Sequence, residues 1–528
     1  MVKSEIILPF GYCERDILSA VSDKLGIDKN EIISYRIVRE GLDLSEKPNI
    51  KCKMSVAIEV DEEREAGLLK MRKRCAFYEH PVYISPLYHA KVRPVVVGAG
   101  PAGLFAALTL AEAGAHPIVI ERGLPVIERT LAVDAFIKDG RLDPECNVQF
   151  GEGGAGTYSD GKLKVGSYDK YKIKVLEELA SFGAPADVIY SATAHVGTDK
   201  LREVVIGIRK RIISLGGEFI FSARLFDIKI KDGRVNGVLY ERGGERYEIP
   251  TGCVILATGH SARDVYALLK SRGVPMERKG FGIGMRVEHP REYINDIVYG
   301  KGRSRELPTA SYHLVTHLNS GRSVYSFCMC PGGSVVAATS EQGGIVTNGM
   351  SDFSRSADNS NSAILVSITP DDFASDDILA GLELQRSIEE RAFSVAGGDY
   401  KAPAIRMEDF VSGKEPQDFG EVLPSYPCGT VLMRPEEYLP EYITDSIKAA
   451  IGDFDDWMGG FYHPDAVFTG PETRSTSPIR VLRGDNFEAL GLKGLYPAGE
   501  GAGYAGGIVS SAVDGIKCAE ALILSQNI

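Results

Sequence analysis

The chain lacks both a disulfide framework and a basic surface. Its 9 cysteines are scattered among 528 residues, odd in number and without a CxxC pair, a pattern that favours reduced thiols in a reducing compartment. The formal net charge is −12, whereas a nucleic-acid surface needs clustered Lys and Arg to bind phosphates. We therefore expect a cytoplasmic protein with no nucleic-acid partner.

Uninterrupted hydrophobic runs of membrane length are also missing. The most apolar stretch, from Val92 to Ile120, contains Gly98, Gly100, Gly103 and Gly114 as well as several prolines, and these residues make a poor membrane helix. The first residues of the chain reach charge too soon for a signal peptide. We expect no membrane partner, whereas the sequence leaves the oligomeric state open.

The length of the chain indicates roughly three domains, and residues 1–90 are predicted to form a small α/β unit. Apolar patterning predicts strands at Ile6–Phe10, Ile32–Arg39 and Lys51–Val60, with a helix at Glu14–Leu25 between the first two. The order strand, helix, strand, strand is typical of half a ferredoxin-like fold.

From residue 91 the pattern changes to buried strand, glycine turn and helix, which predicts a doubly wound, Rossmann-like α/β domain. We assign residues 91–279 to its first part, 280–487 to an inserted α+β substrate domain, and 488–528 to a return that completes the first domain. The nucleotide-binding domain is therefore expected to be discontinuous. Within its first part, Thr198 or Asp199 is expected to cap one helix, and Ser261 with Asp264 is expected to form a capping box for another.

The strongest motif follows the first buried strand of this domain. Gly98, Gly100 and Gly103 form a GxGxxG pattern, and Glu121 ends the next strand. Gly98 allows the tight turn, Gly100 lets the backbone approach a pyrophosphate, and Gly103 lets the helix pack closely on the sheet. The phosphates would lie at the helix N-terminus, and Glu121 would accept hydrogen bonds from the adenosine ribose. The motif predicts a dinucleotide without saying which one.

Three further glycine-rich segments indicate FAD. Residues 257–259 (ATG) resemble a motif of the flavoprotein disulfide reductases, and residues 494–508 are similar to the closing FAD motif of the fumarate reductase and succinate dehydrogenase relatives. The second resemblance implies that Glu500 holds the ribityl chain or phosphate, and that amides at the following Gly-Gly turn face the flavin edge. Residues 147–162 form a loop whose small polar side chains, with Lys162, could reach ring atoms or phosphate. The predicted FAD-binding residues are Gly98, Gly100, Pro101, Ala102, Gly103, Glu121, Arg122, Gly153, Gly154, Gly156, Thr157, Ser159, Leu225, Ala257, Thr258, Gly259, Gly499, Glu500, Gly506, Gly507 and Ile508.

Five segments together resemble one group of proteins. They are FGEGGAGTYSDGKL (150–163), ATGHSARD (257–264), SFCMCPGG (326–333), ETRSTSP (472–478) and YPAGEGAGYAGGI (496–508). They are similar to bacterial FAD-dependent dehydrogenases, often labelled NAD-utilising dehydrogenases, which are related to the glutathione reductase and fumarate reductase FAD-binding fold. The resemblance extends over nearly the whole chain and implies the fold and FAD, but it names no substrate.

A second nucleotide motif, which a dedicated NAD(P)H domain would need, is not evident. The nearest candidate, Gly280 to Val287, lacks the third glycine and runs into Pro290, which a following helix would not tolerate. We therefore expect one stable dinucleotide site for FAD, with NAD(P)H only as a transient electron donor.

The candidate catalytic residues are Lys162, in the glycine-rich loop, and Glu472, Arg474 and Tyr504, which lie in the inserted region and beside the closing motif. Arg474 could hold a substrate carboxylate, and Glu472 or Tyr504 could relay protons. An Arg–Glu pair that fixes a loop explains Arg474 and Glu472 equally well. Cys328 and Cys330 share a strand face as residues i and i+2, but buried reduced thiols are the favoured interpretation, and no metal set is completed nearby.

The favoured function is that of an FAD-dependent oxidoreductase, a dehydrogenase or reductase. It would move a hydride between flavin N5 and a small organic substrate in the cleft of the inserted domain. One alternative is a flavin monooxygenase or an RNA-modifying flavoprotein, although RNA would require a basic face. Another is a non-catalytic flavin-binding sensor or interaction protein that acts through its N-terminal unit.

Overall fold

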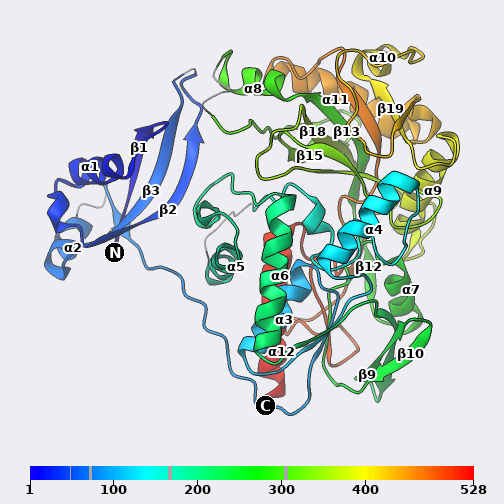
Figure 1. Ribbon diagram of the computed structural model, residues 1–528, viewed down its shortest axis with the longest axis horizontal. Coiled ribbons are helices and arrows are strands. Elements are labelled where there is room, and N and C mark those ends of the chain that lie inside the picture. The colour runs from blue at the N-terminus through cyan, green and yellow to red at the C-terminus, as the bar shows by residue number, and fades with distance from the viewer. Residues whose placement is uncertain (48, 71–73, 164–168, 303–306, 528) are drawn as a thin grey trace.

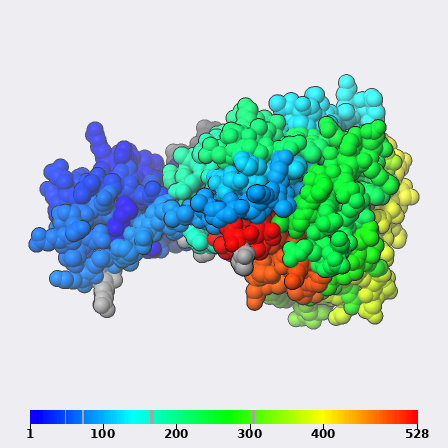
Figure 2. Space-filling view, turned by 90° about the horizontal axis from the view of Figure 1, so that it is seen from below, coloured from blue at the N-terminus to red at the C-terminus, as the bar shows by residue number. Residues whose placement is uncertain are grey.

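The computed structural model describes residues 1–47, 49–70, 74–163, 169–302 and 307–527. A small N-terminal unit lies at one end of the molecule, and the extended segment 78–94 connects it to a larger body (Figure 1). The space-filling view shows the same unit as a separate lobe (Figure 2). No helix within the described ranges is long and apolar enough to cross a membrane.

The N-terminal unit is a complete ferredoxin-like fold rather than the predicted half. Its elements are β1 (Val2–Pro9), α1 (Glu14–Leu25), β2 (Ser34–Asp43), β3 (Lys51–Glu59), α2 (Glu62–Leu69) and β4 (Ala76–Phe77). The antiparallel sheet has the order β2-β3-β1-β4, as expected for a split βαβ arrangement. The bounds of α1 are confirmed. The helix α2 was not predicted, because it has no apolar face that repeats along the sequence and Leu68 is its one buried residue.

The predicted doubly wound fold is confirmed by a parallel sheet in the larger body. Its order is β23-β11-β5-β6-β7, with β5 (Val95–Val97), β6 (Ile118–Ile120), β7 (Glu218–Ile220), β11 (Val254–Leu256) and β23 (Leu495–Pro497). Because β23 pairs with β11, the end of the chain returns to complete the sheet. The helices α3 (Pro101–Glu112), α6 (Thr198–Ser214) and α12 (Ile508–Gln526) pack against one another beside it (Figure 1). A meander of β8 (Arg224–Lys231), β9 (Arg234–Arg242) and β10 (Glu245–Ile249) completes this part.

A larger, mostly antiparallel sheet is inserted between β11 and β23. Its order is β14-β15-β18-β13-β21-β19-β20, with β13 (Phe281–Pro290), β14 (Val315–His317), β15 (Ser323–Cys330), β18 (Asn359–Ile368), β19 (Ala402–Arg406), β20 (Thr430–Leu432) and β21 (Val467–Glu472). The helices α9 (Ala380–Val395) and α11 (Glu441–Met458) contribute to its core. The Gly280–Val287 segment forms most of the central strand β13, so it is not the start of a second nucleotide-binding helix.

Shorter elements complete the body. They are α4 (Val126–Asp139), a 3₁₀ turn at Ala155–Tyr158, α5 (Lys170–Ser181), α7 (Arg263–Ser271), α8 (Arg291–Tyr299), α10 (Met407–Ser412), and the pairs β12 (Met276–Arg278) with β22 (Ile479–Val481) and β16 (Ser334–Ala337) with β17 (Thr347–Met350).

Both predicted helix caps are wrong. The N-cap of α7 is Ala262 and that of α6 is Gly197, and neither makes a side-chain cap. Ser261 instead donates to the Gln149 side chain at 3.2 Å, while the predicted Thr198 hydroxyl donates to two backbone carbonyls of the 147–162 loop. The carboxylates of Asp199 and Asp264 accept from Phe353 N–H and from Arg122. These polar side chains form hydrogen bonds with residues distant in the sequence instead of capping the helices that they precede.

Candidate functional site

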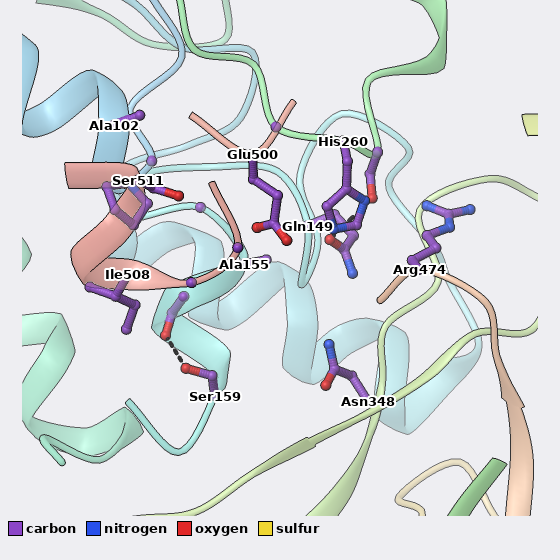
Figure 3. Close-up of a pocket in the computed structure, with 18 of the residues that line it drawn as sticks. Ala102, Gln149, Ala155, Ser159, His260, Asn348, Arg474, Glu500, Ile508 and Ser511 are labelled. Carbon is purple, nitrogen blue, oxygen red and sulfur yellow. Dashed lines mark hydrogen bonds between the residues drawn. The ribbon is translucent and has the colours of Figure 1, made fainter. Parts of the chain in front are cut away.

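A cavity of about 340 Å³ lies where the parallel sheet meets the seven-stranded sheet. Residues from every predicted motif line it, and Figure 3 shows ten of the lining residues by name. Of the residues predicted from sequence, those on the wall are Gly98, Gly100, Pro101, Ala102, Glu121, Arg122, Gly154, Gly156, Ser159, Lys162, Leu225, Ala257, Thr258, Gly259, Glu472, Arg474, Glu500, Gly506, Gly507 and Ile508. The fold therefore brings together segments that are more than 400 residues apart, such as those around Gly98 and Gly507.

Four predicted FAD-binding residues lie behind the wall of the cavity: Gly103, Gly153, Thr157 and Gly499. A Cβ at Gly103 would lie 1.9 Å from the Gly98 carbonyl oxygen, so only glycine allows α3 to pack so closely on the turn. A Cβ at Gly153 would lie 2.0 Å from Thr157 Oγ1, and one at Gly499 would lie 2.7 Å from the Ala102 Cβ. Glycine at these positions is required by close packing.

Tyr504, a predicted proton relay, does not reach the cavity. Its side chain is 37% exposed, and the guanidinium carbon of Arg483 lies 3.7 Å from its ring centroid. The structure thus gives Tyr504 a cation–π contact at the surface.

Two helix N-termini open onto the cavity. α3 begins after Gly100 and α12 after Gly507, and both N-cap residues line the wall. Gly507 has a φ of +125°, and a Cβ on Gly506 or Gly507 would meet no atom within 4 Å, so this turn faces open space. Unpaired amides and the positive ends of two helix dipoles therefore meet at one place, which suits a bound anion or a reduced, negatively charged ring.

Glu121 organises the glycine loops as well as facing the cavity. Its carboxylate accepts hydrogen bonds from the N–H groups of Ala99 (2.7 Å), Gly123 (3.0 Å) and Gly151 (3.0 Å). The neighbouring Arg122 lies over the Phe150 ring and donates to both carboxylate oxygens of Asp264 at 2.9 Å. One acidic residue thus fixes three turns at the dinucleotide end of the cavity.

The seven-stranded sheet contributes a buried ion pair. Arg286 on β13 donates from Nε and Nη2 to the two carboxylate oxygens of Glu472 at 2.6 and 2.9 Å, and neither side chain is more than 3% exposed. Burial lowers the pKa of Arg286, but Glu472 outweighs this effect and raises it. The remaining N–H groups reach Asn348 and Asn361. Glu472 is therefore bound on both carboxylate oxygens by Arg286 as well as being a wall residue.

Arg474 forms a second buried network, and its partner is Glu389 rather than Glu472. Its guanidinium donates to both carboxylate oxygens of Glu389 at 3.0 and 2.7 Å, and Arg263 donates to the same carboxylate. Burial acts to raise the pKa of Glu389, yet the two arginines lower it to about 2. In Figure 3 the guanidinium of Arg474 extends away from the side chains gathered around Glu500.

Three polar side chains face one another near the middle of the cavity (Figure 3). Burial raises the pKa of Glu500 to about 7, with Lys279 opposing it. Burial, with Arg474 and Arg263 nearby, lowers the pKa of His260 to about 3, so its imidazole is neutral. Gln149 donates to the Ala338 carbonyl oxygen at 3.2 Å. Gln149 was not singled out from the sequence, and the available signal was its place within the 147–162 loop.

Lys162 lies on the opposite wall with little access to solvent. Its ammonium donates to the Met329 carbonyl oxygen, and burial lowers its pKa despite the nearby carboxylate of Asp160. Asp160 itself is bound by Arg355 through both oxygens. The predicted Lys162 is therefore brought to the sheet side of the cavity.

Comparison with known proteins agrees with this geometry. Residues 280–475 match a family described as FAD-dependent protein, C-terminal domain-like, and residues 93–130 match an FAD binding domain. A protein of Clostridium beijerinckii, described as uncharacterized, is 45% identical over 509 residues, which are 95% of each chain. The chain belongs to this family of FAD-dependent proteins. FAD is therefore the cofactor of this flavoprotein, as the sequence predicted, and its class is that of the FAD-dependent oxidoreductases.

Distant solved structures are reductases or dehydrogenases by name. E. coli quinol fumarate reductase FrdA is 13% identical over 83% of this chain and 70% of its own, with a TM-score of 0.37. The 3-ketosteroid dehydrogenase of Rhodococcus jostii is 13% identical over 84% and 100%, with a TM-score of 0.34. A geranylgeranyl bacteriochlorophyll reductase-like protein of Thermoplasma acidophilum is 12% identical over 83% and 79%, with a TM-score of 0.36. Similarities this distant say nothing about the substrate of the flavoprotein.

The residues of the flavoprotein fit FAD on structural grounds. The open turn at Gly506 and Gly507 and the close approach of Gly154 to Gly100, where an added Cβ would lie 3.0 Å from the neighbouring Cα, leave a cradle of backbone without side chains. Backbone amides at the starts of α3 and α12 would hold the pyrophosphate and the ring edge. Glu500, which lines the same cavity, would hold the ribityl chain or the phosphate.

Proposed function

We propose that the flavoprotein transfers a hydride between FAD and a small, uncharged polar substrate bound against the seven-stranded sheet. Bound FAD supplies the two-electron chemistry. The observation that supports this function is the composition of the cavity: one wall is the glycine cradle, and the other carries Lys162, Asn348 and Glu472 from the inserted region and its neighbours.

The charges of the wall support an uncharged substrate. The guanidinium groups of Arg286 and Arg474 are each bound by a buried carboxylate on two oxygens, so neither presents an unpaired charge. The remaining cation of this wall, Lys162, donates to the Met329 carbonyl oxygen, and burial lowers its pKa. Glu500, with its pKa raised to about 7, is able to hold or release a proton near neutral pH. The cavity thus offers hydrogen bonds and one proton-exchanging group beside the cofactor.

Anaerobic mixing of the purified flavoprotein with NADH, and then with NADPH, tests the electron donor. Fast, saturable bleaching of the visible flavin band would identify a nicotinamide as a transient reductant. No bleaching, with a flavin that dithionite still reduces, would make the organic substrate the electron donor. Hydroxylated product formed with oxygen would favour a monooxygenase instead, and stable partner binding without turnover of any donor would favour a sensor.

A further inference from the structure

The strand β15 is irregular where it borders the cavity. Its pairing with β18 shifts register between Phe327 and Cys330, and Cys328 has a φ of +42°, a left-handed conformation that costs energy for a residue with a side chain. The regular alternation expected for residues i and i+2 is therefore broken. Such bulges occur next to active sites, where they redirect a side chain.

The two cysteines of this bulge differ in access and are in contact. Cys328 lines the cavity, whereas Cys330 is fully buried behind it. The Cys330 thiol donates to the Cys328 carbonyl oxygen at 3.2 Å. Cα atoms two residues apart are separated by at most about 7 Å, which is near the upper limit that a disulfide spans.

Cations face this pair from two other elements. Arg286 on β13 donates to the Cys328 carbonyl oxygen at 2.8 Å and its Nη1 lies 4.0 Å from the Cys330 sulfur. Lys162 binds the carbonyl oxygen of the intervening Met329. The anionic groups nearby are Asp160, Glu472 and Glu500, of which the first two are neutralised by arginines. Arg286 is paired with Glu472 but still directs N–H groups at both cysteines, and with the ammonium of Lys162 it favours a thiolate.

The charge pattern distinguishes the two thiols. The adjacent Cys330 thiol, together with Arg286 and Lys162, lowers the pKa of Cys328 against the effect of burial, while the pKa of Cys330 is raised. Burial raises the pKa of other thiols such as Cys253 and Cys518. One accessible, acidic thiol beside one buried, protonated thiol is the arrangement of a reactive pair.

We propose that Cys328 and Cys330 are a redox-active dithiol that closes to a disulfide and exchanges two electrons with FAD. The Cys328 thiolate and the Cys330 thiol lose two electrons and one proton as the S–S bond forms. FAD takes up the two electrons and the proton to give the reduced anion, and the reverse step opens the disulfide. The proposal rests on the FAD cofactor and is independent of the substrate proposed above.

Photoreduction of the FAD-bound protein tests the exchange directly. The protein is first treated with a mild thiol oxidant, desalted, and illuminated anaerobically with EDTA, which delivers electrons to the flavin. It is then quenched in acid, unfolded in denaturant at mildly alkaline pH and alkylated with iodoacetamide, because the thiolate is the form that reacts. The mass of the Cys328–Cys330 peptide is measured by mass spectrometry. We expect this peptide to carry two alkyl groups after illumination and none in a dark sample. The half-buried Cys428, on the same domain, is the internal control and should be alkylated equally in both.

Electron counting gives a second, quantitative result. The oxidised wild-type protein should take up twice as many electrons per FAD as Cys328→Ser or Cys330→Ser, since a disulfide is a two-electron couple like the flavin, and Cys428→Ser should match the wild type. Equal uptake by wild type and the two variants would overturn the proposal. Failure of the wild-type peptide to form a disulfide, or a disulfide that survives flavin reduction, would do so even if the variants did not fold.

Discussion

The two ends of the cavity are built by different means. At the parallel sheet, the surface is mainly backbone: glycine turns expose the amides at the starts of α3 and α12. At the seven-stranded sheet, the surface is made of side chains, and its charged members are held by partners from other strands, as Arg286 holds Glu472. The parallel-sheet end depends on glycine at a few fixed positions. The other end depends on charged side chains that are stable in the interior only when both members of each pair are present. We expect the two ends to fail in different ways when residues are changed.

The largest effect is expected on the side-chain end. Arg286→Met keeps much of the side-chain volume but leaves Glu472 buried without its partner, so the free energy of unfolding should fall by about 3–5 kcal/mol. Urea unfolding measures the loss. The exposed pair of Arg480 and Glu277 is the control, and Arg480→Met should cost less than about 1 kcal/mol. Adding Glu472→Gln to Arg286→Met should recover part of the loss, and no recovery would show that the charge of Glu472 is not the cause.

A smaller effect is expected at the backbone end, from one added methyl group. Gly103→Ala should lower stability by about 2–3 kcal/mol and weaken FAD retention, because its Cβ would lie 1.9 Å from the Gly98 carbonyl oxygen. Thermal unfolding and the visible flavin absorbance of the purified protein measure both. The matched control is Gly452→Ala in α11, where a Cβ meets no atom within 4 Å and the change should be stabilising by up to about 1 kcal/mol. Similar behaviour of the two variants would refute a packing role for Gly103.

The smallest expected effect is on the pH dependence of the free energy of unfolding, and it comes from Glu500. With its pKa raised to about 7, Glu500 holds a proton in the folded FAD-free protein that the unfolded chain releases near its ordinary pKa. Stability should therefore fall as pH rises from about 5 to about 8, by roughly 1–2 kcal/mol more in wild type than in Glu500→Gln. Urea unfolding across this range gives the comparison. Parallel curves for the two proteins would mean that Glu500 titrates normally.

The dinucleotide end was largely predictable from the sequence. The spacing of Gly98, Gly100 and Glu121 was enough to predict a dinucleotide site. A backbone turn that approaches a phosphate tolerates only glycine, and an acidic residue at the end of the next strand is part of the same motif. The resemblance of the segment around Glu500 to a known closing motif then indicated FAD, and the family match confirms it. Helix caps were the local exception, since Ser261 and Asp264 were drawn to tertiary partners instead.

The sheet end was not predictable in the same way. Arg286 lies in the strand β13, which was considered from the sequence only as a candidate second nucleotide motif and was rejected as one. Its partner Glu472 is 186 residues away in the sequence. The acidity of Cys328 likewise depends on Lys162 and Arg286, which come from other parts of the chain.

The sequence by itself determined the nucleotide fold, the cofactor and the glycine cradle. Local backbone conformation and hydrophobic periodicity depend on residues that are close together in the sequence. Only the tertiary structure decided which charges are paired, which thiol is accessible and which predicted catalytic residues reach the cavity. Tyr504, for example, lies close in sequence to the Gly506–Gly507 turn, yet its ring stacks under Arg483 at the surface. Electrostatic energies depend on distances and burial between residues far apart in the chain, and these are set only when the sheets pack together.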